Sequence, residues 1–294
     1  MQNVTDIRKH FKQALKDQKF TIDRTGAKTI ELLGACFKAT EPAIFGTPNQ
    51  EYIDREIDWY MNQSTNVNDI GGEKIPAAWQ ATANQYGEIN SNYGHLILSK
   101  KYYEQYEQVF NELRNNPDSR RASMIYTRPS IWVEYNEDGK NDFICTNSVT
   151  YYIRDNKLNC VVQMRSNDVV FGYKNDYAWQ GFVLQHLLDD LNEVRLSKDD
   201  ERFQYEPELQ LGDIYWQVQN LHVYERHFHL VEGEKDAEEH SHYYYDTDRN
   251  MPLQSGGAKG SKTWDADHYK EIKFSVNGIS SDDFNWRPNR EFYD

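Results

Sequence analysis

Between residues 145 and 224 the chain alternates between the two hydrophobic periods that characterise strands and helices. Apolar residues at every second position predict strands over residues 145–154, 158–165 and 214–224. Between the last two strands, residues 175–192 carry large apolar side chains along one side at helical spacing, which predicts a long helix. Interleaved strands and helices place the chain in the α/β or α+β class, although this pattern leaves the direction of the strands open.

The pattern upstream of residue 136 predicts further helices and strands. The expected helices cover residues 3–18, 53–61 and 103–113, and the expected strands cover residues 30–37 and 122–135. We expect the strand over residues 30–37 to be largely buried, because it is apolar over most of its length. Residues 21–28 are polar with one glycine, which is typical of a turn or a strand edge.

The composition changes after residue 230. An acidic run, a loop rich in glycine and serine at 255–262, and a short strand pattern at 272–276 follow one another. We therefore expect a compact domain over residues 1–230 and a polar, acidic region over residues 231–294 that packs on it. The pair His240 and His242 suggests a mobile acidic loop more than a metal site.

The formal net charge of −14 narrows the range of partners. A surface of this sign repels nucleic acid polymers and anionic membranes, so neither is expected to bind. No apolar run is long enough for a membrane helix, and three cysteines are too few for a disulfide framework, which favours a reducing cytoplasm. A small anionic substrate remains possible where cations gather. Such a site could draw on Arg24, Lys28, Arg120, Arg121 and Arg165.

The three cysteines differ in their surroundings. Cys36 and Cys160 lie among apolar residues, and we expect both to be buried and inert. Cys145 is followed by polar residues and preceded by Asn141 and Asp142, so it is the best candidate for a reactive thiol in a polar cleft.

Other candidate residues have ordinary structural explanations when they are taken alone. Arg120 and Arg121 are adjacent, as on a solvated helix face, yet planar guanidiniums also bind the two oxygens of a phosphate. Glu56 could pair with the neighbouring Arg55 at a helix surface. His222 and Tyr224 share one face of a strand, where they could form a core pair or a binding pair.

Seven short motifs occur along the chain in a fixed order. They are Asp23-Arg24-Thr25-Gly26, Glu56 with Trp59, Asn92-Tyr93-Gly94, Asp118-Ser119-Arg120-Arg121, Cys145, Arg165-Ser166-Asn167-Asp168, and His222 with Tyr224. In this order the set resembles the thymidylate synthase family over roughly residues 23–230. The resemblance implies a large mixed β-sheet flanked by helices, and a homodimer formed sheet to sheet.

The resemblance also implies a role for each motif. Cys145 is the nucleophile, Glu56 organises water and moves protons, and His222 and Tyr224 bind the deoxyribose 3′-hydroxyl. The phosphate is bound by Arg24, Arg165 and Ser166 of one subunit and by Arg120 and Arg121 of the other. The co-substrate, 5,10-methylenetetrahydrofolate, is contacted by Asp168, Trp79 and Tyr93.

Asp176 stands where thymidylate synthases carry an asparagine that recognises uracil. Cytosine inverts the donor and acceptor pattern at N3 and C4, and a carboxyl group can match that pattern. The chain therefore resembles the branch of the family that hydroxymethylates dCMP, as found in bacteriophages, which implies the cytoplasm of an infected bacterium. Cys145-Thr146 and Lys174-Asn175-Asp176 also depart from the synthase pattern, which has Cys-His and Pro-Phe-Asn.

Three alternatives remain at this stage. Asp176 could simply cap the helix predicted over residues 175–192. The enzyme could act on dUMP, as a synthase or as a hydroxymethylase, although Asp176 argues against this. The chain could also be a non-catalytic, RNA-binding relative, which the retention of Cys145 and the acidic surface argue against.

Overall fold

The computed structural model describes residues 1–196, 207–233, 245–246 and 251–252. By its internal contacts the chain divides into two units, residues 1–235 and 236–294. Within the described part of the second unit, a short antiparallel pair joins β8 (Tyr245–Asp246) to β9 (Met251–Pro252). The predicted loop at 255–262, the strand at 272–276 and the histidines at 240 and 242 lie outside the described residues.

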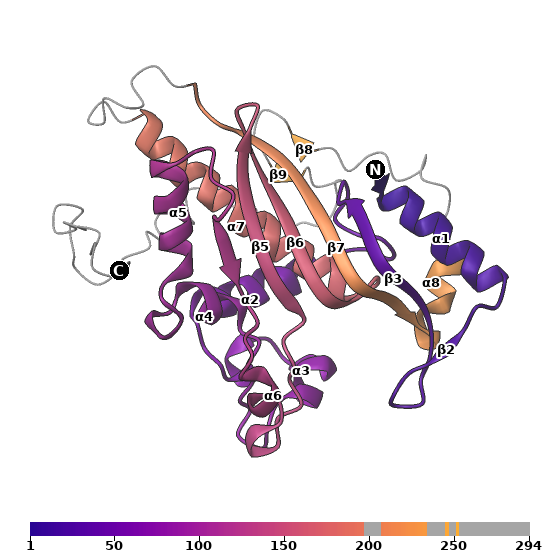
Figure 1. Ribbon diagram of the computed structural model, residues 1–294. Coiled ribbons are helices and arrows are strands. Elements are labelled where there is room, and N and C mark those ends of the chain that lie inside the picture. Colours follow the sequence, from indigo (N-terminus) through magenta and orange to yellow (C-terminus); the bar gives the residue numbers. More distant parts are fainter. Residues whose placement is uncertain (197–206, 234–244, 247–250, 253–294) are drawn as a thin grey trace, which may run out of the picture. The chain divides into compact units, whose positions relative to one another are not determined.

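A mixed sheet of seven strands forms the frame of the first unit (Figure 1). The order is β1-β3-β7-β6-β5-β4, with β2 paired to the outer part of β3. β6 and β7 are parallel, as are β1 and β3, and the other pairs are antiparallel. The strands are β1 (Gln2–Asn3), β2 (Thr21–Ile22), β3 (Lys28–Lys38), β4 (Ser123–Ile125), β5 (Thr146–Arg154), β6 (Lys157–Asp168) and β7 (Gln210–Tyr224).

Helices cover one face of this sheet. α7 crosses behind β5, β6 and β7 in Figure 1, and its buried side packs on β6 and β7. The mixed sheet with flanking helices confirms the predicted fold class.

The α-helices are α1 (Val4–Lys16), α2 (Gln50–Met61), α3 (Ala77–Thr82), α4 (Tyr93–Leu98), α5 (Gln105–Asn115), α6 (Ile131–Glu134), α7 (Gly172–Leu196) and α8 (Phe228–Gly233). Short 3-10 turns cover Val67–Ile70, Lys100–Tyr102, Glu137–Gly139 and Glu225–His227. Among the described residues, no helix is both long and apolar enough to cross a lipid bilayer.

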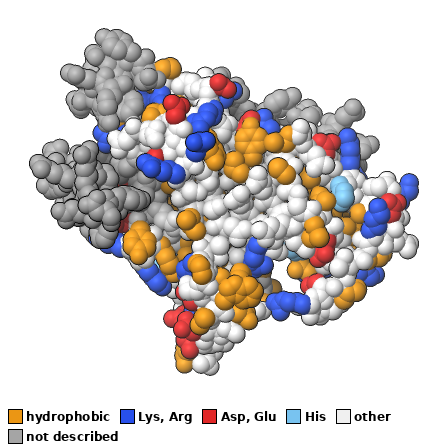
Figure 2. Space-filling model, in the orientation of Figure 1, with side chains coloured by type: hydrophobic (Ala, Val, Ile, Leu, Met, Phe, Trp, Pro, Cys, Tyr) orange, Lys and Arg blue, Asp and Glu red, His pale blue; other side chains and the backbone are white. Residues whose placement is uncertain are grey.

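The opposite face of the sheet is open in the single chain. A row of polar side chains crosses it, in which Ser148 donates to Gln163 at 3.0 Å and Gln163 donates to Gln217 at 3.0 Å. Cys36 lies beside Gln217 on the next strand. Figure 2 shows much of this face in white, the colour of uncharged polar side chains and backbone. The chain as a whole carries a net charge of −14, so the scarcity of charged side chains is specific to this face.

This open face corrects two expectations for β3. Cys36 was expected to be buried, but it is exposed, and Leu33 is 71% exposed. The apolar run at residues 30–37 indicated burial on both sides of the strand, whereas helices cover only one side of most of the sheet. Cys160 lies on the covered side and is fully buried, as predicted.

The prediction of one strand over residues 122–135 is also wrong for most of its length. Only Ser123–Ile125 pairs as a strand, and a single helical turn follows at Ile131–Glu134. Pro129 lacks the N–H that a strand ladder needs, and Arg128 forms an ion pair with Glu134 across the turn. Similarly, Tyr103 precedes α5 in the left-handed region, with φ 67°, instead of starting the helix.

Candidate active site

Cys145 lies at the end of the loop that leads into β5, next to Arg165 of β6. The Arg165 Nη2 atom is 3.5 Å from the thiol, and the backbone N–H of Arg165 donates to the Cys145 carbonyl at 2.9 Å. Burial raises the pKa of the Cys145 thiol to about 11, while the Arg165 guanidinium acts in the opposite direction. The thiol therefore keeps its proton at neutral pH, and Arg165 is placed to stabilise the thiolate once it forms.

The loop before Cys145 is held by a buried carboxylate. Asp142 accepts hydrogen bonds from the backbone N–H groups of Asn90 and Ser91 at 2.6 and 2.7 Å, and from the Ser91 hydroxyl at 2.6 Å. Arg165 donates to the carbonyl groups of Phe143 and Ile144 in the same loop. These contacts fix the backbone that carries the thiol.

Asp176 lies within α7, one turn after its start. The helix begins at Gly172, and the Asp168 carboxylate closes the turn before it by accepting from the backbone N–H groups of Val170 and Phe171 at 3.2 and 2.9 Å. Asp176 is thus the fifth residue of the helix, and the interpretation that it caps the helix is wrong.

The Asp176 carboxyl group accepts a hydrogen bond from Asn167 Nδ2, which donates to Oδ2 at 2.7 Å. The Tyr93 hydroxyl also lowers the pKa of this carboxyl group. Burial, followed by the negative charge of Glu56, raises the pKa of Asp176 to about 8. At neutral pH the group is therefore a carboxylic acid that can donate its own proton.

Glu56 is buried at the end of an aromatic cluster. Tyr52, one helical turn earlier on α2, donates to Glu56 Oε1 at 2.5 Å, and the Trp79 indole N–H donates to the same oxygen at 3.0 Å. Burial raises the pKa of Glu56 to about 7. The alternative in which Glu56 pairs with Arg55 is wrong, since Arg55 donates to the Gly71 carbonyl.

Tyr93 connects the strand that carries the thiol with Asp176. Its ring stacks on Tyr60 with centroids 5.4 Å apart, and its hydroxyl accepts a hydrogen bond from Thr146 at 2.9 Å. Thr146 thus has a defined partner in the place where the synthase pattern has histidine. Trp79 is half-buried and meets Trp59 edge to face at 5.1 Å, which leaves part of its ring available to a ligand.

His222 and Tyr224 lie on one face of β7, as their spacing predicts, with ring centroids 5.0 Å apart. Asp168 is opposite His222 on the neighbouring strand. The hairpin that carries Arg24 lies alongside, because Thr29 of β3 pairs with Tyr224. Asp23 closes that hairpin turn by accepting from the backbone N–H groups of residues 25 and 27.

The structure brings one of the four predicted phosphate-binding arginines, Arg165, into contact with Cys145. Arg24, Arg120 and Arg121 are exposed, and Arg121 pairs with Glu112 at 3.0 Å. Ser166 follows Arg165 on β6 and is half-buried. In a single chain the arginine pair at residues 120–121 remains on the surface next to β4.

Comparison with known proteins shows to which family the chain belongs. The family model described as thymidylate synthase matches residues 7–244. The chain belongs to the thymidylate synthase family. It is 55% identical over 229 residues to proteins named deoxycytidylate 5-hydroxymethyltransferase from Enterobacteria phages T4 and T6, which covers 78% of this chain and 89% of each relative. Its identity to the thymidylate synthase of Buchnera aphidicola is 24% over 230 residues, covering 75% of this chain and 79% of that protein.

Several residues that support this thymidylate synthase-like site were not found from the sequence. Tyr52 could have been suggested by its i, i+4 spacing from Glu56, which places both on one helix face. Asn167 and Thr146 were noticed only as motif positions, and their contacts with Asp176 and Tyr93 join segments that no local pattern connects. Trp216, whose indole N–H donates to Asn167, is likewise not connected with it by any local pattern in the sequence.

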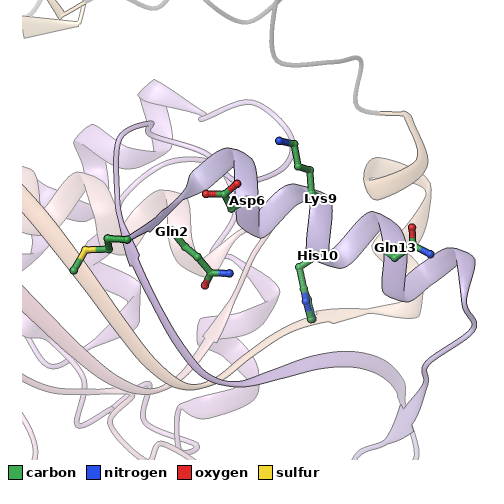
Figure 3. A pocket seen from close by; sticks show the side chains of 6 residues that line it. Gln2, Asp6, Lys9, His10 and Gln13 are labelled. Carbon is green, nitrogen blue, oxygen red and sulfur yellow. The ribbon is translucent and has the colours of Figure 1, made fainter.

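A separate surface depression lies along α1 and contains none of the predicted site residues. Figure 3 shows its side chains, in which Lys9 and His10 point away from each other. Its charges are mixed, with Asp6 close to Lys9 in the sequence, and nothing in it selects a ligand. The lining residues are Met1, Gln2, Asp6, Lys9, His10 and Gln13.

Proposed function

We propose that this protein is a deoxycytidylate 5-hydroxymethyltransferase. It converts dCMP, 5,10-methylenetetrahydrofolate and water into 5-hydroxymethyl-dCMP and tetrahydrofolate. The observation that carries the proposal is the buried Asp176 carboxyl group, which accepts from Asn167 and holds its own proton at neutral pH. The names of the phage relatives, at 55% identity, support the same substrate.

The protonated carboxyl fits cytosine better than uracil. Cytosine presents an acceptor at N3 and a donor amine at C4, so a carboxylic acid can donate to the first and accept from the second. Uracil presents N3–H and O4 at the same positions, which oppose this arrangement. A site that hydrogen-bonds one base leaves its buried polar groups unpaired with the other, which is the basis of strong discrimination.

The reaction begins with Cys145. Its thiol loses a proton and its sulfur bonds to C6 of the pyrimidine, with Arg165 stabilising the thiolate. C5 then attacks the methylene carbon of the folate co-substrate, and loss of the C5 proton and of tetrahydrofolate leaves an exocyclic methylene group. Addition of water to that group and departure of Cys145 from C6 give the hydroxymethyl product. Glu56, whose pKa of about 7 lets it both accept and donate protons, organises the water and the proton transfers.

The sugar, the phosphate and the folate have distinct predicted contacts. His222 and Tyr224 bind the 3′-hydroxyl of the deoxyribose. Arg24, Arg165 and Ser166 bind the phosphate, and we propose that Arg120 and Arg121 of a second copy complete this cluster. Trp79, Tyr93 and Asp168 face the folate; the half-buried ring of Trp79 offers a flat surface that suits a pterin.

A homodimer is supported by the open face of the sheet. That face is uncharged over most of its area in Figure 2, and it exposes Leu33 and Cys36. Sheet-to-sheet packing would cover these residues. We further propose that the enzyme acts in the cytoplasm of a phage-infected bacterium.

The test is product identity. Purified protein is incubated with 5,10-methylenetetrahydrofolate and either dCMP or dUMP, and the nucleotide and folate products are analysed by mass spectrometry. We expect 5-hydroxymethyl-dCMP and tetrahydrofolate from dCMP. Stoichiometric dihydrofolate with a methylated pyrimidine would contradict the proposal and identify a synthase, while absence of any product with either nucleotide would favour a non-catalytic relative.

A further inference from the structure

A chain of three side chains fixes the orientation of the Asp176 carboxyl group. The Trp216 indole N–H lies 3.3 Å from Asn167 Oδ1, and Asn167 Nδ2 lies 2.7 Å from Asp176 Oδ2. An indole can only donate, so the Asn167 oxygen must face Trp216 and its NH₂ group must face Asp176. Since that NH₂ group can only donate as well, Asp176 Oδ2 is an acceptor.

Tyr93 is a second polar group that acts on Asp176. Its oxygen accepts from Thr146 at 2.9 Å, and the Tyr93 hydroxyl lowers the pKa of the carboxyl group, as a donor does. Among the described residues, no group accepts a hydrogen bond from Asp176. The acid proton has no protein acceptor and is available to a substrate.

We propose that Asn167 and Trp216 are specificity-determining residues that hold the proton of Asp176 on Oδ1, so that the carboxyl group fits cytosine and rejects uracil. This inference rests on the proposed function and adds residues that act through Asp176. Oδ2 keeps a second lone pair for the C4 amine of cytosine, while Oδ1–H faces N3.

Without the hydrogen bonds that join Trp216, Asn167 and Asp176, a carboxylic acid discriminates poorly between the two bases. Its proton can sit on either oxygen, and moving it to Oδ2 would present a donor to O4 and an acceptor to the N3–H of uracil. Asn167 opposes that move because a proton on Oδ2 would meet its NH₂ group. The discrimination thus depends on the amide as well as on the carboxyl.

The surroundings keep the amide in this orientation. Asn167 is 3% exposed and Trp216 is fully buried, so water does not replace either partner. Trp216 meets Tyr173 of α7 edge to face at 5.3 Å, which fixes the indole between sheet and helix. A Cβ atom at Gly172 would come within 3.1 Å of Asn167 Nδ2, so the glycine leaves room for the amide.

Three variants test the proposal in the full-length enzyme. Asn167→Ala frees Oδ2 and should lower the ratio of kcat/KM for dCMP to that for dUMP by about tenfold or more. Trp216→Phe lets the amide turn over and should lower the ratio by a smaller factor. The double variant removes the unpaired indole donor that Asn167→Ala leaves behind, so it should regain thermal stability while keeping the altered ratio.

Trp179→Phe is the matched control. Trp179 is another buried indole, 1% exposed, whose N–H donates to the Tyr126 hydroxyl at 3.3 Å, whereas that of Trp216 donates to Asn167. Trp179→Phe should lower thermal stability by a comparable amount, while the ratio of kcat/KM for dCMP to that for dUMP stays at the wild-type value. An unchanged ratio in Asn167→Ala, with both substrates slowed equally, would overturn the proposal.

Nucleotide binding separates this inference from the proposed function. Dissociation constants for dCMP and dUMP are measured by calorimetry in the absence of folate for the same proteins. A shift in the ratio of these constants supports the role of Asn167 and Trp216 even if the wild type yields no hydroxymethylated product, an outcome that would contradict the proposed function alone. A ratio of constants that stays at the wild-type value in Asn167→Ala would contradict the role of Asn167.

Discussion

At the scale of single residues, the thiol of Cys145 provides the most direct test. Its pKa of about 11 means that attack depends on Arg165, and a serine hydroxyl in its place would ionise far less. We expect Cys145→Ser to lower turnover by at least about 10³-fold while dCMP still binds. Single-turnover kinetics and calorimetry measure the two effects. Cys36→Ser is the control, since that thiol is exposed on the open sheet face; a loss of turnover there, with activity kept in Cys145→Ser, would refute the assignment.

Asp176 offers a second test, of base specificity. An amide recognises uracil only with its NH₂ group toward O4, an orientation that Asn167 opposes. We therefore expect the reversal in the double variant Asp176→Asn/Asn167→Ala, which should weaken the dCMP reaction and improve the dUMP reaction. A mismatched group in a dry site costs about 1–3 kcal/mol, which corresponds to a change of about tenfold or more in the ratio of the two kcat/KM values. Because Asp176 lies within α7 and not at its first residue, the substitution leaves the start of the helix intact. An unchanged ratio would remove the main support for cytosine.

The same carboxyl group should destabilise the fold at high pH. Its pKa is raised in the folded state from the ordinary value to about 8, so between those two values the folded protein holds a proton that the unfolded chain has lost. Stability must therefore fall as the pH rises through this interval. We expect the gain in Tm of Asp176→Asn over the wild type to be larger at pH 9 than at pH 5. Scanning calorimetry at the two pH values measures it, and an equal gain at both would contradict the raised pKa.

At the scale of elements, α2 and α4 approach each other most closely at Gly94. A Cβ atom there would lie 1.8 Å from the Tyr60 carbonyl oxygen, and backbone cannot yield as a flexible side chain can. Gly94→Ala should therefore push the helices apart, displace Tyr93, and cost about 1–3 kcal/mol in the free energy of unfolding. Gly181→Ala is the control, because it lies inside α7 with open space around it and should stabilise the protein by about 0.5–1 kcal/mol. Urea unfolding of both variants compares them.

The helices and strands also show how much of the fold could be predicted from the sequence. β5, β6, β7 and α7 were predicted because each keeps one hydrophobic period over at least nine residues. The start of α7 was misplaced because the turn that leads into it is closed by Asp168, which belongs to the preceding strand. In the same way, the seven motifs predicted which residues belong to the site, but the contact of Asn167 with Asp176 depends on how α7 returns over β6. That contact follows from tertiary packing, which local spacing does not encode.

At the scale of the whole molecule, the two faces of the sheet explain the errors at β3. An apolar strand indicates burial, but the pattern does not distinguish burial under a helix from burial against another copy of the chain. Leu33 and Cys36 are exposed in one chain because helices cover only the opposite face at their level. Their exposure favours a partner with the same surface, as in a two-fold dimer.

A two-fold dimer of this kind would build each active site from two chains, and that can be measured. Arg121 pairs only with Glu112 among the contacts described for it and is 80% exposed, so Arg121→Ala should leave the fold intact while it weakens phosphate binding. In a mixture with Cys145→Ser, one of the two sites of each hybrid dimer would combine an intact Cys145 with an intact Arg121 from the other chain. We expect such a mixture, after subunit exchange, to regain activity that neither variant has alone, up to about a quarter of the wild-type level when half of the dimers are hybrids. Arg154→Ala, which removes an exposed arginine outside the predicted phosphate cluster, should remain active without mixing. Hybrid dimers verified by mass spectrometry that show no regained activity would mean that each site is formed by a single chain.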